Sequence, residues 1–137
     1  MSYRTVLKAL VSGGKTAVLS SILGGLGLLV YTFLVDEKVV HMSFALAALA
    51  VVSVLFGGIQ GGQASGTVGW LHGGAVACFY LCLLLIFRMV VTPSLGYSPA
   101  GIIFALGILC AGGAGGVLGV NLRFARQRSY KRRYMSY

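Results

Sequence analysis

Charged residues are scarce in this chain of 137 residues, and acidic ones are almost missing. Only 9% of the residues are charged, and Asp and Glu together number two. About a quarter of the residues in an average soluble domain are charged, so this composition excludes an ordinary soluble fold. Hydrophobic residues make up 58% of the chain and gather in runs of about twenty, the length that crosses a hydrocarbon core of ~30 Å. The chain is therefore expected to be an integral membrane protein.

Cysteine is also scarce, and its placement argues against both disulfides and metal binding. Cys78, Cys82 and Cys110 all lie inside apolar runs. An odd number of cysteines in lipid-embedded segments does not suggest a disulfide framework. Cys78 and Cys82 share a helix face at a spacing of four residues, but no histidine or carboxylate lies near enough in the sequence to complete a metal site. We therefore expect all three to be small packing residues.

The groups that catalysis requires are equally sparse. The only carboxylates, Asp36 and Glu37, stand beside Lys38 in a short polar stretch, which is typical of solvated loop charges. His41 follows, yet three potential ligands within six exposed residues fall short of a metal site. An enzyme needs an activated nucleophile, a general acid or base, or a metal centre. We therefore expect no catalytic residues, no cofactor, no metal and no enzymatic activity.

One histidine is a candidate functional residue. His72 follows Trp70 by two residues, at the mouth of an apolar run and among glycines that allow close backbone approach. Ionisable residues within a membrane are functional candidates by default, although this presumption weakens at the interface. A hydrogen bond to a turn carbonyl or to a lipid headgroup is the plainer alternative for His72.

Basic residues, by contrast, are plentiful and lie at the two ends of the chain. Of the eleven Lys and Arg residues, Lys38 and Arg88 alone lie in the interior. The others flank the apolar region: Arg4, Lys8, Lys15, Arg123, Arg126, Arg128, Lys131, Arg132 and Arg133. Because Lys and Arg are retained on the cytoplasmic side, both termini are expected to be cytoplasmic, which requires an even number of spans.

The stretch 121–137 is expected to form a basic cytoplasmic tail. Its mixture of Arg and Tyr would also suit a nucleic-acid-binding arm. Its position directly after an apolar run favours instead an anchor on the anionic headgroups of the lipid bilayer, where each basic residue contributes ~1 kcal/mol. We therefore expect lipid, and no nucleic acid, as the partner of this tail.

Four apolar segments predict an all-α membrane protein with four transmembrane helices. The spans cover about residues 16–35, 43–62, 68–91 and 100–120 of a single integral membrane domain over residues 1–137. The polar stretches DEKVVH and TPSLGYSP separate spans one and two, and spans three and four, on the external side. The second stretch contains two prolines, which disfavour helix in the residues before them. This pattern predicts a multi-pass protein of the cell membrane.

Glycine is frequent, with 21 residues, and raises the question of a phosphate-binding loop. Gly14, Lys15 and Thr16 match the end of a Walker A motif, but Ala9 stands where the motif needs its first glycine, and no strand pattern precedes it. The alternative is helix packing, because glycines recur every four residues along several spans. Small residues at this spacing let helix backbones approach closely in lipid, where little hydrophobic force drives helices together.

We therefore predict a glycine-rich packed bundle with a helix-packing seam, whose members face other helices rather than lipid: Gly57, Gly61, Gly73, Gly112, Gly115, Gly116 and Gly119. The stretch Gly61–Gly69 is predicted to be a tight cytoplasmic turn, because Gly, Ser and Thr favour turns. Paired glycines open spans one and three and close spans two and four, as two tandem hairpins of like orientation would. Glycine pairs match easily in such a chain, so chance is the simpler explanation of this repeat.

The stretch GGIQGGQASGTVGWLHGG (57–74), followed by AVACFYLCLLLIF, resembles the YrzE-like family of small membrane proteins from Gram-positive bacteria. The shared features are the paired glycines at the end of span two and the sequence Gly-Trp-Leu-His-Gly at 69–73. In that family the turn before the Trp tends to carry basic residues, whereas Gln63, Ser65 and Thr67 stand here. The resemblance implies four spans and brings no known reaction, ligand or partner.

These patterns predict a small structural or accessory protein that associates through glycine-rich helix faces, either with copies of itself or with a larger membrane complex. The alternative is a subunit of an oligomeric channel or transporter. Polar residues near the middle of the spans amount to Ser20, Ser21, Ser53 and the cysteines, which is fewer than a solute pathway normally has.

The charge bias leads to a topology that can be tested. We expect reporter fusions after Glu37 and after Ser94 to be external and a fusion after Ser65 to be cytoplasmic. The measurement is the activity of a reporter enzyme that works on one side of the membrane only. An external signal after Ser65 would contradict the four-span arrangement.

Overall fold

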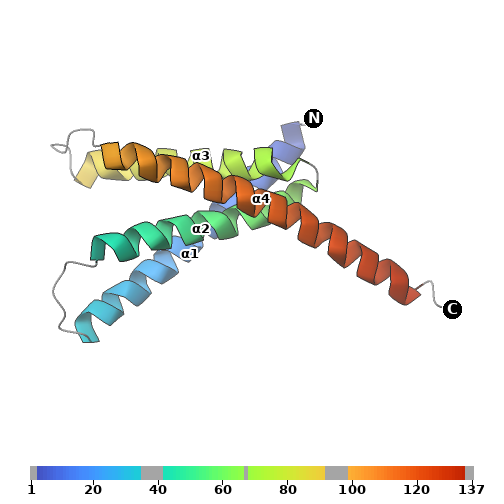
Figure 1. Cartoon of the computed structure of the whole chain (residues 1–137), viewed down its shortest axis with the longest axis horizontal. Coiled ribbons are helices and arrows are strands. Elements are labelled where there is room, and N and C mark those ends of the chain that lie inside the picture. The colour runs from blue at the N-terminus through green and yellow to red at the C-terminus, as the bar shows by residue number, and fades with distance from the viewer. Residues whose placement is uncertain (1–2, 35–41, 67, 92–98, 135–137) are drawn as a thin grey trace.

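The structure is a computed structural model that describes residues 3–34, 42–66, 68–91 and 99–134. These residues form no strand and four α-helices (Figure 1): α1 (Tyr3–Leu34), α2 (Met42–Ser65), α3 (Gly69–Val91) and α4 (Pro99–Tyr134). Each helix is long and apolar enough to cross a membrane. The prediction of an all-α membrane protein with four transmembrane helices is confirmed.

Two helices extend well beyond the predicted spans. α1 begins at Tyr3, whereas the predicted span starts near residue 16, and α4 continues to Tyr134 through most of the basic tail. Lys, Arg, Gln and Ala favour helix, and no proline interrupts either extension. The helices therefore continue past the ends of the apolar runs. Of the two predicted external loops, DEKVVH lies outside the described residues, as does TPSLGYSP except for Pro99, which starts α4.

The connection between α2 and α3 is shorter than the predicted turn over Gly61–Gly69. α2 continues to Ser65, and Gly66 then adopts a φ of 66°. The amide of Gly66 donates to the carbonyl of Gly62 over 3.1 Å, which is the left-handed helix ending that glycine provides. The prediction that the turn starts at Gly61 was wrong, because close packing of Gly61 and Gly62 against other helices keeps this stretch helical.

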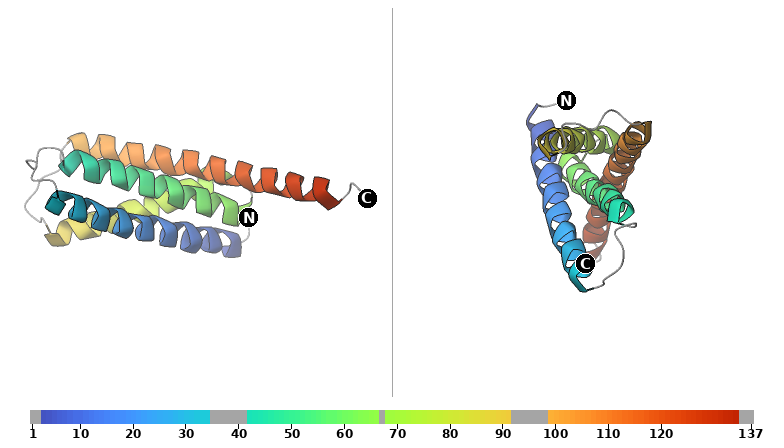
Figure 2. Two further views of the ribbon diagram at one scale, coloured as in Figure 1. Left: turned by 90° about the horizontal axis from the view of Figure 1, so that it is seen from below. Right: turned by 90° about the vertical axis from the view of Figure 1, so that its left-hand side faces the viewer.

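α2 and α3 are the central pair of the bundle. Each of them contacts all three other helices, whereas the described parts of α1 and α4 do not contact each other. In the end-on view of Figure 2, α1 and α4 lie on opposite sides, with α2 and α3 between them. Figure 1 shows that the pair α1–α2 and the pair α3–α4 diverge away from the α2–α3 connection. The bundle is therefore narrow at this end, called the turn end below, and wide at the other.

The interior is built mostly from small side chains, and most of the large ones point outward. The buried cluster consists of Ala17, Ala50, Val54, Ala77, Tyr80 and Ile108. Many large hydrophobic side chains are exposed, among them Phe33, Phe87 and Ile103. A soluble protein rarely leaves large continuous apolar surfaces in water, so this distribution is typical of helices that face lipid.

One polar contact joins α1 to α3 beyond the narrow end. The Oγ of Ser21 lies 2.7 Å from the hydroxyl of Tyr80 and 2.9 Å from the carbonyl oxygen of Ala17. A carbonyl can only accept, so the single Ser21 hydroxyl proton goes to Ala17 and the Tyr80 hydroxyl donates to Ser21 Oγ. This contact connects two helices whose outer portions diverge.

We expect Ser21→Ala and Tyr80→Phe to be energetically coupled. Hydrogen bonds between membrane helices contribute ~0.6 kcal/mol on average and up to ~1.7 kcal/mol, so the double variant should lose less stability than the two single losses combined. The measurement is a double-mutant cycle of unfolding free energies in mixed micelles. Ser20→Ala is the control, because the Ser20 hydroxyl bonds to the Ala17 carbonyl without reaching α3. Additivity of Ser21→Ala with Tyr80→Phe would contradict the link.

Candidate functional site

One face of α2 packs directly on α1 through glycine. A Cβ added at Gly57 would lie 2.7 Å from the Ala17 Cβ and 2.8 Å from the Gly13 carbonyl oxygen. A Cβ added at Gly13 would lie 2.6 Å from the Gly57 carbonyl oxygen, and one at Gly61 would lie 3.3 Å from the Ala9 oxygen. Real Cβ atoms essentially never approach backbone closer than 3.0 Å. The two backbones can therefore meet only because Gly13 and Gly57 carry no side chain.

The neighbouring face of α2 packs on α4 in the same way. A Cβ at Gly58 would lie 2.5 Å from the Gly112 carbonyl oxygen, and one at Gly62 would lie 3.0 Å from the Gly116 Cα and closer still to its oxygen. Consecutive residues of a helix point about 100° apart, as 3.6 residues per turn require. The doubled pattern GGIQGG therefore supplies α2 with two adjacent glycine faces, one for α1 and one for α4.

α3 joins the same contact from its first two turns. A Cβ at Gly112 would lie 2.8 Å from the Gly73 carbonyl oxygen, and one at Gly116 would collide with the Gly69 carbonyl. Conversely, a Cβ at Gly73 would lie 2.8 Å from the Gly116 Cα. Gly112 and Gly116 thus lie where α2, α3 and α4 meet backbone to backbone.

The structure places all seven seam glycines in the interior of the bundle. Gly115 and Gly119 complete the set, and a Cβ on either would collide with a carbonyl of α2, that of Leu55 or that of Ile59. Four further glycines contact the backbone of another helix as closely: Gly13 and Gly69, which share the four-residue spacing of small residues, and Gly58 and Gly62, which were not predicted from sequence. The doubled glycines were the available signal for Gly58 and Gly62, because each doublet exposes two faces.

Not every glycine is used inside the bundle. A Cβ would meet nothing within 4 Å at Gly25, Gly27, Gly74, Gly101 and Gly107. The spacing of small residues along α1 therefore loses its packing role at Gly25, where the bundle widens. The glycines in close contact with the backbone of another helix therefore lie at the turn end, whereas Gly107 faces outward and Gly25 lies where the bundle widens.

His72 lies in the first turn of α3 and is 2% exposed. Its Nδ1 lies 2.9 Å from the carbonyl oxygen of Val68 in the turn. Because that carbonyl can only accept, Nδ1 carries the proton, and neutral His72 then keeps an acceptor lone pair on Nε2. Nε2 is buried and has no hydrogen-bond partner among the described residues. The ring therefore makes the turn contact considered from sequence, and a further functional role for His72 stays a prediction.

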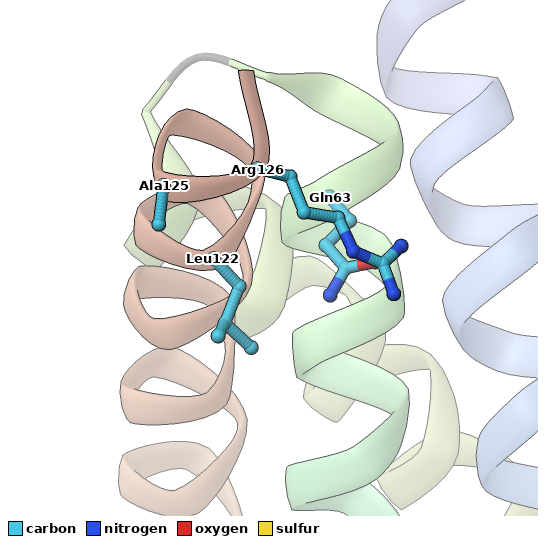
Figure 3. A pocket seen from close by; sticks show the side chains of 4 residues that line it. All are labelled: Gln63, Leu122, Ala125 and Arg126. Carbon is cyan, nitrogen blue, oxygen red and sulfur yellow. The ribbon is translucent and has the colours of Figure 1, made fainter. Parts of the chain in front are cut away.

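The basic residues of α4 reach back over the end of α2. The Arg123 guanidinium donates from Nη1 to the Gln63 carbonyl oxygen over 2.9 Å. Positive charge is favourable there, because the last carbonyls of a helix carry partial negative charge. Arg126, one turn further, lines a pocket with Gln63, Leu122 and Ala125 (Figure 3). α4 thus presents one arginine to the protein backbone and another to a pocket.

A second cavity, of about 420 Å³, lies at the wide end. Ten residues from all four helices line it: Ser21, Gly25, Ser43, Leu46, Ala47, Leu49, Ala50, Tyr80, Leu84 and Phe104. The Ser21–Tyr80 hydrogen bond lies in this lining, together with the hydroxyl of Ser43. The cavity is therefore mostly apolar with three hydroxyl groups.

Metal ligands do not cluster in the part of the chain that is described. No group of three or more His, Cys, Asp or Glu side chains there could hold a metal ion, and the free Cys78, Cys82 and Cys110 are exposed. Asp36, Glu37 and His41, which were considered together from sequence, lie outside the described residues.

Comparison with known proteins gives a family without a known role. The model of the family described as "Protein of unknown function (DUF3792)" matches residues 3–119, which include α1, α2, α3 and most of α4. No curated protein and no solved structure matches the chain.

The close contacts at Gly116 can be tested against a matched position in the same helix. We expect Gly116→Ala to lower the free energy of unfolding by about 1–3 kcal/mol, the usual range for overpacking, because the rigid Gly69 backbone occupies the space. At Gly113 the nearest atom to an added Cβ is the Trp70 carbonyl oxygen at 4.0 Å. Gly113→Ala should therefore be neutral or stabilising by up to ~1 kcal/mol, through helix propensity. Unfolding in detergent measures both, and equal effects would contradict the packing role of Gly116.

Proposed function

We propose that this chain, which belongs to the DUF3792 family, is a small structural or accessory protein that associates with other helices in the cell membrane. The proposal covers copies of the same chain and a larger membrane complex as partners. The observation that carries it is a face of small residues on α4 that points away from the bundle.

This face, the outer α4 face below, consists of Gly107, Cys110, Ala111 and Ala114. A Cβ at Gly107 would meet nothing within 4 Å, and Gly107, Cys110 and Ala114 are exposed. Positions spaced three, four and seven residues apart lie on the same side of a helix. Glycine costs roughly 1 kcal/mol relative to alanine in a helix interior, and no contact within the bundle compensates that cost at Gly107. Close approach of a helix from another molecule would supply the compensation.

The remaining features of this proposal come from the sequence. The excess of Lys and Arg at both ends supports a multi-pass protein of the cell membrane with both termini cytoplasmic. The stretch 57–74 supports a relationship to the YrzE-like proteins of Gram-positive bacteria. With two acidic residues in the whole chain, both within two residues of Lys38, we propose that the protein is not an enzyme.

Cysteine cross-linking in native membranes tests the outer α4 face. We expect a variant that keeps Cys110 as its only cysteine to form a cross-linked dimer with a short thiol reagent, because Cys110 is exposed among small residues. A variant that keeps only Cys82 is the control, because large side chains such as Phe79, Leu83 and Ile86 surround this exposed thiol on α3. Equal cross-linking of both variants would indicate random collision.

A large side chain at Gly107 distinguishes a defect in assembly from a defect in folding. Gly107→Leu should abolish the Cys110 cross-link and leave unfolding unchanged, because the side chain enters space that is empty within the chain. If Cys110 does not cross-link, copurification from native membranes decides between a larger complex and no partner. A chain that is alone in both experiments would contradict the accessory role.

A second candidate function is that of a subunit of an oligomeric channel or transporter. The cavity at the wide end favours it, because all four helices line the cavity and the hydroxyls of Ser21, Ser43 and Tyr80 lie in its lining. The narrow end is filled by the seam, so any pathway through a single chain would need the glycine contacts to open. Passage of ions or small solutes into liposomes that contain the purified protein would favour this candidate over the first.

A further inference from the structure

The pocket beside Arg126 combines hydrogen-bond donors with an apolar wall. It has a volume of about 270 Å³ and is lined by Gln63 of α2 and by Leu122, Ala125 and Arg126 of α4. Figure 3 shows the Arg126 side chain reaching from α4 toward the Gln63 side chain, with Leu122 and Ala125 along α4 beside them. A guanidinium offers five N–H donors and a glutamine amide two. Donors of this kind suit the oxygens of a phosphate group.

Arg126 lacks a counter-charge within the described residues. The two acidic residues of the chain, Asp36 and Glu37, follow the far end of α1, and the described ranges contain no carboxylate side chain. Arg123, by comparison, donates from Nη1 to the Gln63 carbonyl oxygen and so holds α4 against the last turn of α2. This contact fixes the backbone of Gln63, from which the pocket's amide extends. The pocket is therefore a positioned site whose cation faces no carboxylate side chain in the described part of the chain.

The height of the pocket matches the boundary of a bilayer. α2 starts at Met42 and α4 starts at Pro99. Gln63 on α2 and Leu122 on α4 therefore each lie about twenty residues from the start of their helix. At 1.5 Å per residue, this length crosses a hydrocarbon core of ~30 Å. Leu118, Leu122 and Ala125 are exposed on one face of α4 and lead from that core to Arg126. An apolar track thus ends at a phosphate-binding group.

We propose that this pocket binds the headgroup phosphate of an anionic phospholipid. Arg126 and Gln63 donate hydrogen bonds to the phosphate oxygens, and the glycerol and the first methylene groups of the lipid lie on Leu122 and Ala125. Basic pockets between membrane helices hold anionic headgroups in this way. The apolar track favours a lipid over a free phosphate ion, which would gain nothing from Leu118 and Leu122. The site rests on the membrane insertion within the proposed function and does not depend on the accessory role.

The experiment uses the full chain, purified in an uncharged detergent, with short-chain phosphatidylglycerol as the probe. We expect the probe to raise the midpoint of thermal unfolding in a saturable way, as any ligand of the folded state does. Phosphatidylcholine with the same acyl chains, and inorganic phosphate, should give little shift. Arg126→Gln and Gln63→Leu should each raise the half-maximal concentration of phosphatidylglycerol, Arg126→Gln by about tenfold, because a charge-assisted contact is lost.

Arg128→Gln is the matched control. It removes the same charge from the same helix, and Arg128 is exposed and does not line the pocket. The control should bind phosphatidylglycerol as the unchanged chain does. Equal losses in Arg126→Gln and Arg128→Gln would overturn the site in favour of diffuse attraction. An equal response to phosphatidylcholine would overturn the role of charge, and an equal response to inorganic phosphate would reassign the pocket to a free anion.

Native mass spectrometry gives a second reading that does not depend on stability. The unchanged chain should retain one more phosphatidylglycerol molecule than Arg126→Gln does, and the same number as Arg128→Gln. Equal retention by all three would contradict the proposal. Cross-linking through Cys110 in the same variants should be unchanged, so a failed lipid site and a failed accessory role give different results.

Discussion

The contact on which the bundle depends is the meeting of three backbones at Gly112 and Gly116. Carbonyl groups of α3 and α4 occupy the positions where side chains would stand, so α2, α3 and α4 can come together there only without Cβ atoms. Little hydrophobic force drives helices together in lipid, so van der Waals contact over such close surfaces contributes much of the association. α1 joins by the same means, through Gly13 against Gly57.

This location of the glycine contacts explains the shape of the bundle. Helices that touch closely at one end and carry larger side chains toward the other must diverge, and Figure 1 shows this divergence. Gly25 no longer contacts another helix, and the Ser21–Tyr80 hydrogen bond lies beside the cavity that the divergence leaves. Close packing therefore holds the turn end, whereas the Ser21–Tyr80 hydrogen bond links α1 to α3 at the edge of the wide end.

The number and type of helices could be predicted from sequence because bilayer thickness sets both the length and the composition of a span. The helix ends could not be predicted, because hydropathy marks only the end of the apolar run. Polar residues such as those of 121–134 favour helix and continue α4 beyond that point. Spacing identified the seam glycines as small residues but did not identify their partners. Gly58 and Gly62 were missed for this reason, since only the packed structure shows that α2 has neighbours on two adjacent faces.

The glycines that pack inside the bundle also determine which residues of α4 face outward. Because Gly112, Gly115, Gly116 and Gly119 occupy the inner faces of α4, its outer face is free to carry the small residues around Gly107. α4 continues as a helix past the apolar run and so brings Arg123 and Arg126 to the last turn of α2. An unstructured tail would not hold these two side chains in place. Close packing of this helix thus creates two outward surfaces of different chemistry on one element. A helix partner and a phosphate would occupy them independently, because the first requires small side chains within the hydrocarbon layer and the second requires charge at its boundary.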